Sequence, residues 1–227
     1  MDELVDKTSR LAIRSETADS YNPILQTFET ITGYARKLRG DISRDEITVT
    51  KQPASPFTAG GVVILLQEPL ANHPWSRGIN RVISDCPTLD ALEEGVQLCS
   101  QGTLSLATGV SLIDVRPFIS KTDKVGLSDA GLQELYRLVG QFIIRKQPHT
   151  VLCMGRDAQR ELGRWSLGDA IKVIPSSHPS RVLNYRPHCT DVKQRQQLLK
   201  SILDAVGCCK ETSQILDIFE SEKHGLH

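Results

Sequence analysis

The chain has 227 residues, of which 39% are hydrophobic and 24% are charged, with 27 basic and 27 acidic residues. This length and composition are typical of one globular α/β domain with some additional helix. The net charge is zero, so the protein is not strongly basic. Its overall charge therefore gives no indication of a nucleic-acid partner. The six cysteines form no C-x-x-C pair, so their spacing predicts neither a zinc site nor an iron–sulfur cluster.

The first ten residues, MDELVDKTSR, lack the apolar segment of a secretory signal, and no apolar run approaches the length of a membrane span. We therefore expect an intracellular protein, nuclear or cytoplasmic, with reduced cysteines and no contact with a membrane. We also expect a monomer.

A helix is predicted between Asn22 and Gly40. Asn22 is a suitable N-cap, Pro23 takes the first helical position, and Gly40 ends the helix. Its apolar residues share one face: Ile24, Phe28, Ile31 and Leu38. The following segment 51–61, KQPASPFTAGG, is rich in Pro, Gly and Ser, which predicts a linker into the main domain.

Four short apolar runs predict buried parallel strands, and helical segments lie between and after them. The runs are 62–67, 110–115, 150–155 and 171–176, and the helical segments are 88–100, 128–146, 156–164 and 190–206. Alternation of this kind predicts a three-layer α/β/α sandwich around a four-stranded parallel sheet. We expect an N-terminal helical extension at 1–56, the α/β domain at 57–207, and at 208–227 a helical tail that packs or binds a partner protein.

Polar residues follow the ends of the predicted strands. Glu68 follows the first strand, Asp114 ends the second, and His178 follows the fourth. Because ligands of parallel sheets bind beyond the carboxyl ends of the strands, we expect two carboxylates and a histidine at one edge, able to hold a water and a leaving group. Taken singly, each residue also has a structural interpretation as a surface acid, an N-cap or a hydrogen-bonding histidine.

This arrangement resembles the uracil-DNA glycosylase superfamily over about residues 60–203. The segment VVILLQEPL resembles the first motif of that family, and GVSLIDV is similar to the strand that supplies its base-recognising side chain. The segment VLCMGRDAQ resembles the strand and helix before the last motif, and SSHPSRVLNYR is similar to the final His-Pro-Ser motif with its intercalation loop.

The resemblance implies a DNA glycosylase, a hydrolase that needs no metal or cofactor. It would cleave the N-glycosidic bond of a flipped-out base, uracil by default, in single- or double-stranded DNA. His178 would donate a hydrogen bond to the departing base as that base gains negative charge, and Glu68 would position the attacking water. The base would be held by Asp114 and the backbone of Gln67. The resemblance also implies DNA contacts from Ser176, Ser177, Pro179, Ser180, Arg181, Val182 and Arg186, with Arg181 and Val182 as the wedge.

Several residues depart from the family pattern. Leu66 replaces the leading glycine of the first motif, and Glu68 replaces an aspartate. Asp114 replaces an asparagine, and an ionised aspartate only accepts hydrogen bonds. It would therefore suit the exocyclic amine of cytosine or adenine and repel O4 of uracil.

Two further base-contacting positions also differ. Leu70 aligns with the tyrosine that excludes a 5-methyl group, and Arg81 aligns with the aromatic residue that stacks on the base. An arginine can stack on a base, or it can pair with Asp114 and fill the pocket. Trp75 or Phe118 is then an alternative stacking platform.

A second interpretation follows from these departures. The chain would be a catalytically degenerate protein with a glycosylase fold, acting as a nucleic-acid-binding or protein-interaction module. The balanced charge and the altered pocket favour this interpretation, whereas the retained histidine and acid favour catalysis. One structural observation separates them: whether Glu68, Asp114 and His178 line one open pocket, or Arg81 fills that pocket.

Overall fold

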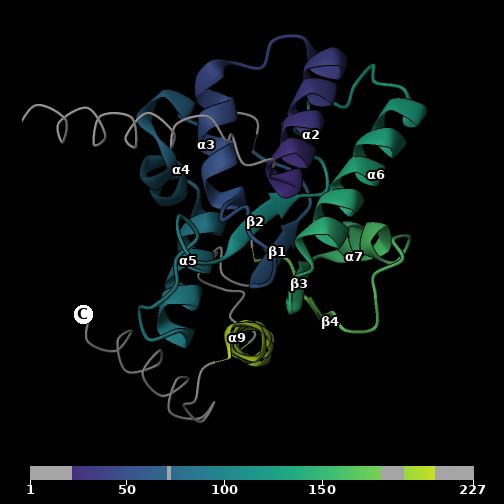
Figure 1. Cartoon of the computed structure of the whole chain (residues 1–227). Helices are drawn as coiled ribbons and strands as arrows, with labels where there is room; N and C mark the ends of the chain where they lie inside the picture. Colours follow the sequence, from purple (N-terminus) through teal and green to yellow (C-terminus); the bar gives the residue numbers. More distant parts are fainter. Residues whose placement is uncertain (1–21, 71–72, 180–191, 208–227) are drawn as a thin grey trace, which may run out of the picture.

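A parallel four-stranded sheet forms the centre of the protein. The computed structural model describes residues 22–70, 73–179 and 192–207. The strands are β1 (Val62–Leu66), β2 (Ser111–Asp114), β3 (Thr150–Met154) and β4 (Lys172–Ser176), in the order β2-β1-β3-β4 (Figure 1). All three strand pairs are parallel. The four predicted strands are confirmed to within one residue at each end.

Seven α-helices and one short 3-10 helix surround this sheet in the described part of the chain. They are α2 (Pro23–Arg39), α3 (Arg44–Ala54), η1 (Trp75–Arg77), α4 (Ile79–Asp85), α5 (Pro87–Cys99), α6 (Asp129–Lys146), α7 (Arg156–Leu162) and α9 (Val192–Val206). Five of these helices were predicted. In α2, the predicted Asn22 cap accepts hydrogen bonds from the N–H groups of Ile24 and Leu25, both at 3.0 Å.

The prediction of a linker at 51–61 is wrong in its first part, because residues 51–54 form the last turn of α3. The start of this helix is encoded locally. Ser43 accepts a hydrogen bond from the N–H of Glu46 at 3.0 Å, and Asp45 and Glu46 place negative charge in the first turn. Pro53 lies in the last turn, and the helix ends one residue after it.

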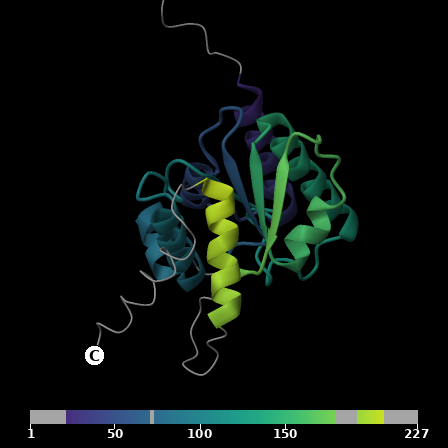
Figure 2. The same ribbon diagram turned by 90° about the horizontal axis from the view of Figure 1, so that it is seen from below.

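The helices cover both faces of the sheet and make three layers (Figure 2). In β1, Val63 and Leu65 pack on one side with α2, α6 and α7, whereas Ile64 and Leu66 pack on the other side with α4, α5 and α9. Because successive side chains of a strand point to opposite faces, continuous apolar strands supply both cores.

Helix α2 shares a core with the sheet. It lies beside α6 (Figure 1). Its residues Phe28 and Ile31 are buried in this core together with residues of α6. The division of the chain at residue 57 stays a prediction.

Among the described residues, none of the helices has the length and apolar character needed to cross a bilayer.

Candidate functional site

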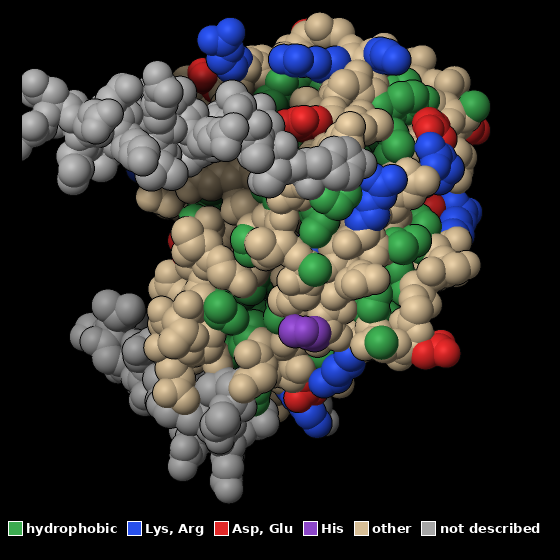
Figure 3. Space-filling model, in the orientation of Figure 1, with side chains coloured by type: hydrophobic (Ala, Val, Ile, Leu, Met, Phe, Trp, Pro, Cys, Tyr) green, Lys and Arg blue, Asp and Glu red, His purple; other side chains and the backbone are tan. Residues whose placement is uncertain are grey.

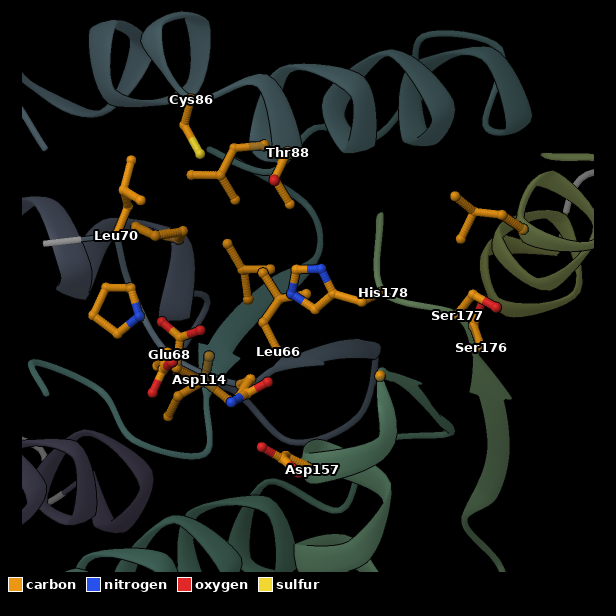
Figure 4. A pocket seen from close by; sticks show the side chains of 18 of the residues that line it. Leu66, Glu68, Leu70, Cys86, Thr88, Asp114, Asp157, Ser176, Ser177 and His178 are labelled. Carbon is orange, nitrogen blue, oxygen red and sulfur yellow. The ribbon is translucent and has the colours of Figure 1, made fainter. Parts of the chain in front are cut away.

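A cavity of about 1430 Å³ lies beyond the carboxyl ends of the strands. It brings together seven of the residues that the sequence singled out: Gln67, Glu68, Leu70, Asp114, Ser176, Ser177 and His178. These side chains come from the ends of β1, β2 and β4, as the parallel topology predicts. Figure 4 shows Glu68 and Asp114 beside each other, with the ring of His178 pointing into the cavity towards their side.

Other predicted site residues lie elsewhere. Arg81 is exposed on α4, forms an ion pair with Asp85 Oδ2 at 2.8 Å, and is not among the residues that line the cavity. It therefore neither fills the pocket nor pairs with Asp114. Pro179 is buried. The predicted DNA contacts Ser180, Arg181, Val182 and Arg186, and the tail at 208–227, lie outside the described residues.

An aromatic wall is supplied by Trp75, one of the two alternatives that the sequence offered. Trp75 lines the cavity, whereas Phe118 is buried in the core against Phe28. His73, which sequence reasoning missed, also lines the cavity and packs against Trp75 with 4.8 Å between ring centroids. Burial lowers the pKa of His73 to about 4, so this ring is neutral at neutral pH. Its Nε2 accepts a hydrogen bond from the N–H of Leu70 at 3.3 Å.

Glu68 is held by a buried arginine that sequence reasoning also missed. Arg116 Nη2 donates to Glu68 Oε2, and Arg116 Nη1 donates to the hydroxyl of Tyr136 at 3.1 Å. Only 2% of the Arg116 side chain is exposed. Burial lowers the pKa of Arg116, but the hydrogen bond with Tyr136 and the charge of Glu68 outweigh burial and raise it overall. The guanidinium therefore stays charged and fixes the Glu68 carboxylate.

The backbone reinforces this pairing. The N–H of Arg116 donates to the carbonyl of Gln67 at 3.2 Å, and the N–H of Val115 donates to that of Leu66 at 2.9 Å. The segments that follow β1 and β2 are thereby kept in register beyond the strands. This continuation brings Arg116 opposite Glu68. It also occupies one lone pair of the Gln67 carbonyl, a part of the backbone that was predicted to hold the base.

Asp114 stands at the end of β2, opposite Leu66 in the strand register. Its Oδ1 is sealed from solvent and has no hydrogen-bond partner among the residues that the structure describes. Burial, and secondly the charge of Glu68, raise the pKa of Asp114 to about 7 against the opposing effect of Arg116. The residue type alone predicts an ionised carboxyl, but near neutral pH the protonated and ionised forms of Asp114 are both populated.

Two neighbouring residues hold the turn that carries His178. The backbone carbonyl of Ser176 accepts hydrogen bonds from the N–H of Gly155 at 2.9 Å and from Gln159 Nε2 at 2.8 Å. Ser177 is exposed, whereas Ser176 is buried, and its sealed hydroxyl has no partner in the described parts of the chain. Ser177 is therefore the better placed of the two serines for the predicted phosphate contact.

Gly155 lies directly against His178. Its φ is +90°, and a Cβ at this position would lie 3.2 Å from the Cβ of His178. We expect Gly155→Ala to lower the free energy of unfolding by about 1–3 kcal/mol, because it combines backbone strain with displacement of His178. Denaturant unfolding measures this loss. The control is Gly163→Ala on the same helix, where φ is −63° and the nearest atom would lie at 3.5 Å, so a change of similar size there would contradict the argument.

The charge around the cavity is mixed. Its other charged lining residues are Lys121, Arg156, Asp157, Lys200 and Asp204. On the face in Figure 3, the Lys and Arg side chains lie in several separate places with Asp and Glu among them. In the parts of the chain that the structure describes, no three or more His, Cys, Asp and Glu residues group closely enough to hold a metal ion. In the comparisons with known proteins, no family model matches this chain, and no curated protein is significantly similar to it in sequence.

Proposed function

We propose that this protein is a DNA base-excision glycosylase with an active site of the uracil-DNA glycosylase type. It is a hydrolase that cleaves the N-glycosidic bond of a base flipped out of DNA. The observation that supports this most is that Glu68, Asp114 and His178 line one open cavity, each near the end of a different strand. The alternative in which Arg81 occupies this cavity loses its support, because Arg81 pairs with Asp85.

The proposed reaction distributes three tasks over these residues. The bond from C1′ of the sugar to the base breaks, and the base leaves with the bonding electrons as an anion. A water oxygen then bonds to C1′, and a water proton neutralises the base. His178 donates a hydrogen bond to the developing anion. Glu68, fixed by Arg116, stabilises positive charge at C1′ and orients the water.

The remaining walls of the cavity suit a flipped nucleotide. Trp75 offers a flat apolar surface on which a base can stack. Lys121, Arg156 and Lys200 offer positive charge for phosphates.

A strand-nicking assay tests the proposal. Single- and double-stranded oligonucleotides that carry uracil, mismatched thymine, hypoxanthine or plain cytosine are incubated with the protein and then cleaved with alkali. We expect nicking of at least one substrate, and a loss of about 100-fold or more in Glu68→Gln and in His178→Ala. The matched controls are Glu134→Gln on the exposed face of α6 and His149→Ala before β3, at the opposite end of the sheet, and both should nick normally.

The same preparation distinguishes the alternative function. If no substrate is nicked at any enzyme excess, the catalytic proposal fails. Retained DNA binding that weakens steeply with salt would then identify a nucleic-acid-binding module, because such binding displaces counterions from phosphates. Absence of both nicking and DNA binding would argue against a DNA partner, and a protein partner would be sought instead.

A further inference from the structure

The two oxygens of the Asp114 carboxyl have different surroundings. Oδ1 is sealed inside the protein, and no described residue donates a hydrogen bond to it. The residue as a whole is only half-buried and lines the cavity, so Oδ2 is the oxygen that faces a ligand. A base in the cavity therefore meets a single oxygen of Asp114, and the chemistry of that oxygen depends on whether it carries a proton.

The surroundings of Asp114 bring its protonated and ionised forms close in free energy near neutral pH. An ionised Asp114 would leave negative charge on a buried oxygen without a partner, close to the carboxylate of Glu68. Arg116 does not relieve this fully, because its two Nη groups donate to Glu68 and Tyr136, and its buried Nε makes no hydrogen bond with Asp114 or with any other described residue. Arg116 still favours the ionised form of Asp114 through its positive charge. Near neutral pH, neither the protonated nor the ionised form of Asp114 therefore dominates strongly.

We propose that Asp114 selects the base to be excised by its own protonation state. With its proton, Oδ2 donates to the carbonyl of a lactam base such as uracil. Without it, Oδ2 accepts from the exocyclic amine of a base such as cytosine. This inference rests on the proposed glycosylase function and deepens it by naming two substrate classes for one site.

Other titratable and charged groups also face this part of the cavity. Those that line the cavity are Glu68, His73, Lys121, Arg156, Asp157, His178, Lys200 and Asp204. Arg116 does not line the cavity but donates to Glu68. Their charges act on any base that enters the cavity. A ratio of two excision rates, measured on the same enzyme at the same pH, cancels effects that act equally on both bases.

The test is the ratio of uracil to cytosine excision in otherwise identical oligonucleotides, from about pH 6 to about pH 8. Because the pKa of Asp114 is about 7, its protonated fraction falls about tenfold over this range and its ionised fraction rises about tenfold. The ratio should therefore fall by about 100-fold. In Asp114→Asn, whose amide donates and accepts at every pH, the ratio should stay constant.

Each outcome has a distinct meaning. A wild-type ratio that does not change with pH overturns the role of Asp114 and leaves the glycosylase proposal intact, and this outcome needs no variant. A ratio that changes equally in wild type and Asp114→Asn also overturns it, because another group then carries the pH dependence. If neither uracil nor any other base is excised at any pH, the glycosylase proposal fails, and the inference that rests on it fails too.

Discussion

Replacing Arg116 by glutamine is expected to lower the free energy of unfolding by about 3 kcal/mol. Removal of one partner of a buried ion pair typically costs about 3–5 kcal/mol, because the other charge stays buried without compensation. The lower end applies here, since 16% of the Glu68 side chain is exposed and water relieves part of its charge. The hydroxyl of Tyr136 also loses its contact with Nη1. Urea unfolding of wild type and variant at neutral pH measures the difference.

The matched control is an exposed arginine that pairs with a carboxylate in the same way. Arg137 donates to Glu134 on the surface of α6, with 53% of its side chain exposed. Exposed pairs contribute about 0–1 kcal/mol, so Arg137→Gln should be nearly neutral. The double variant Arg116→Gln with Glu68→Gln should lose less stability than the two single losses combined, because no uncompensated charge is left. Strict additivity would contradict a direct coupling of Glu68 with Arg116.

The sheet and most helices were predictable because their determinants are local. The apolar run of β3 is continuous since both faces of that strand are covered. Asn22 and Gly40 mark the ends of α2 within the sequence itself. The start of α3 was equally local, with Ser43 three residues before Glu46, but the neighbouring Pro- and Gly-rich segment concealed it. The pairing of Arg81 with Asp85 also follows from their i,i+4 spacing.

The interior of the site was less predictable because its determinants are distant in sequence. Glu68 and Arg116 are 48 residues apart, and only the pairing of β1 with β2 brings them together. The charge state of Asp114 depends on burial and on this same pair, so the residue type alone suggested an ionised acceptor. His73 gave no sequence signal, since its contact with Trp75 arises from the turn before η1.

Replacing Asp114 by asparagine is expected to stabilise the protein increasingly as the pH rises. The pKa of Asp114 is about 7 in the folded protein, against an ordinary value of 3.8. Between these values the folded wild type binds more protons than the unfolded chain, so its stability falls as the pH rises, and asparagine does not titrate. The free energy of unfolding of Asp114→Asn relative to wild type should rise by about 1.4 kcal/mol per pH unit from about pH 4 to about pH 7. The total is up to about 4 kcal/mol, and the difference is constant at higher pH.

Thermal and urea unfolding of both proteins across this pH range measure the effect without any need for excision. Asp41→Asn is a control of opposite sign. The hydrogen bond from Arg39 lowers the pKa of Asp41. The free energy of unfolding of wild type should therefore rise relative to that of Asp41→Asn as the pH rises through the acidic range. The gain should be small, because 76% of the Asp41 side chain is exposed and solvent screens the pair. If Asp114→Asn behaved like Asp41→Asn, Asp114 would be ionised throughout, and it could only accept hydrogen bonds from a base.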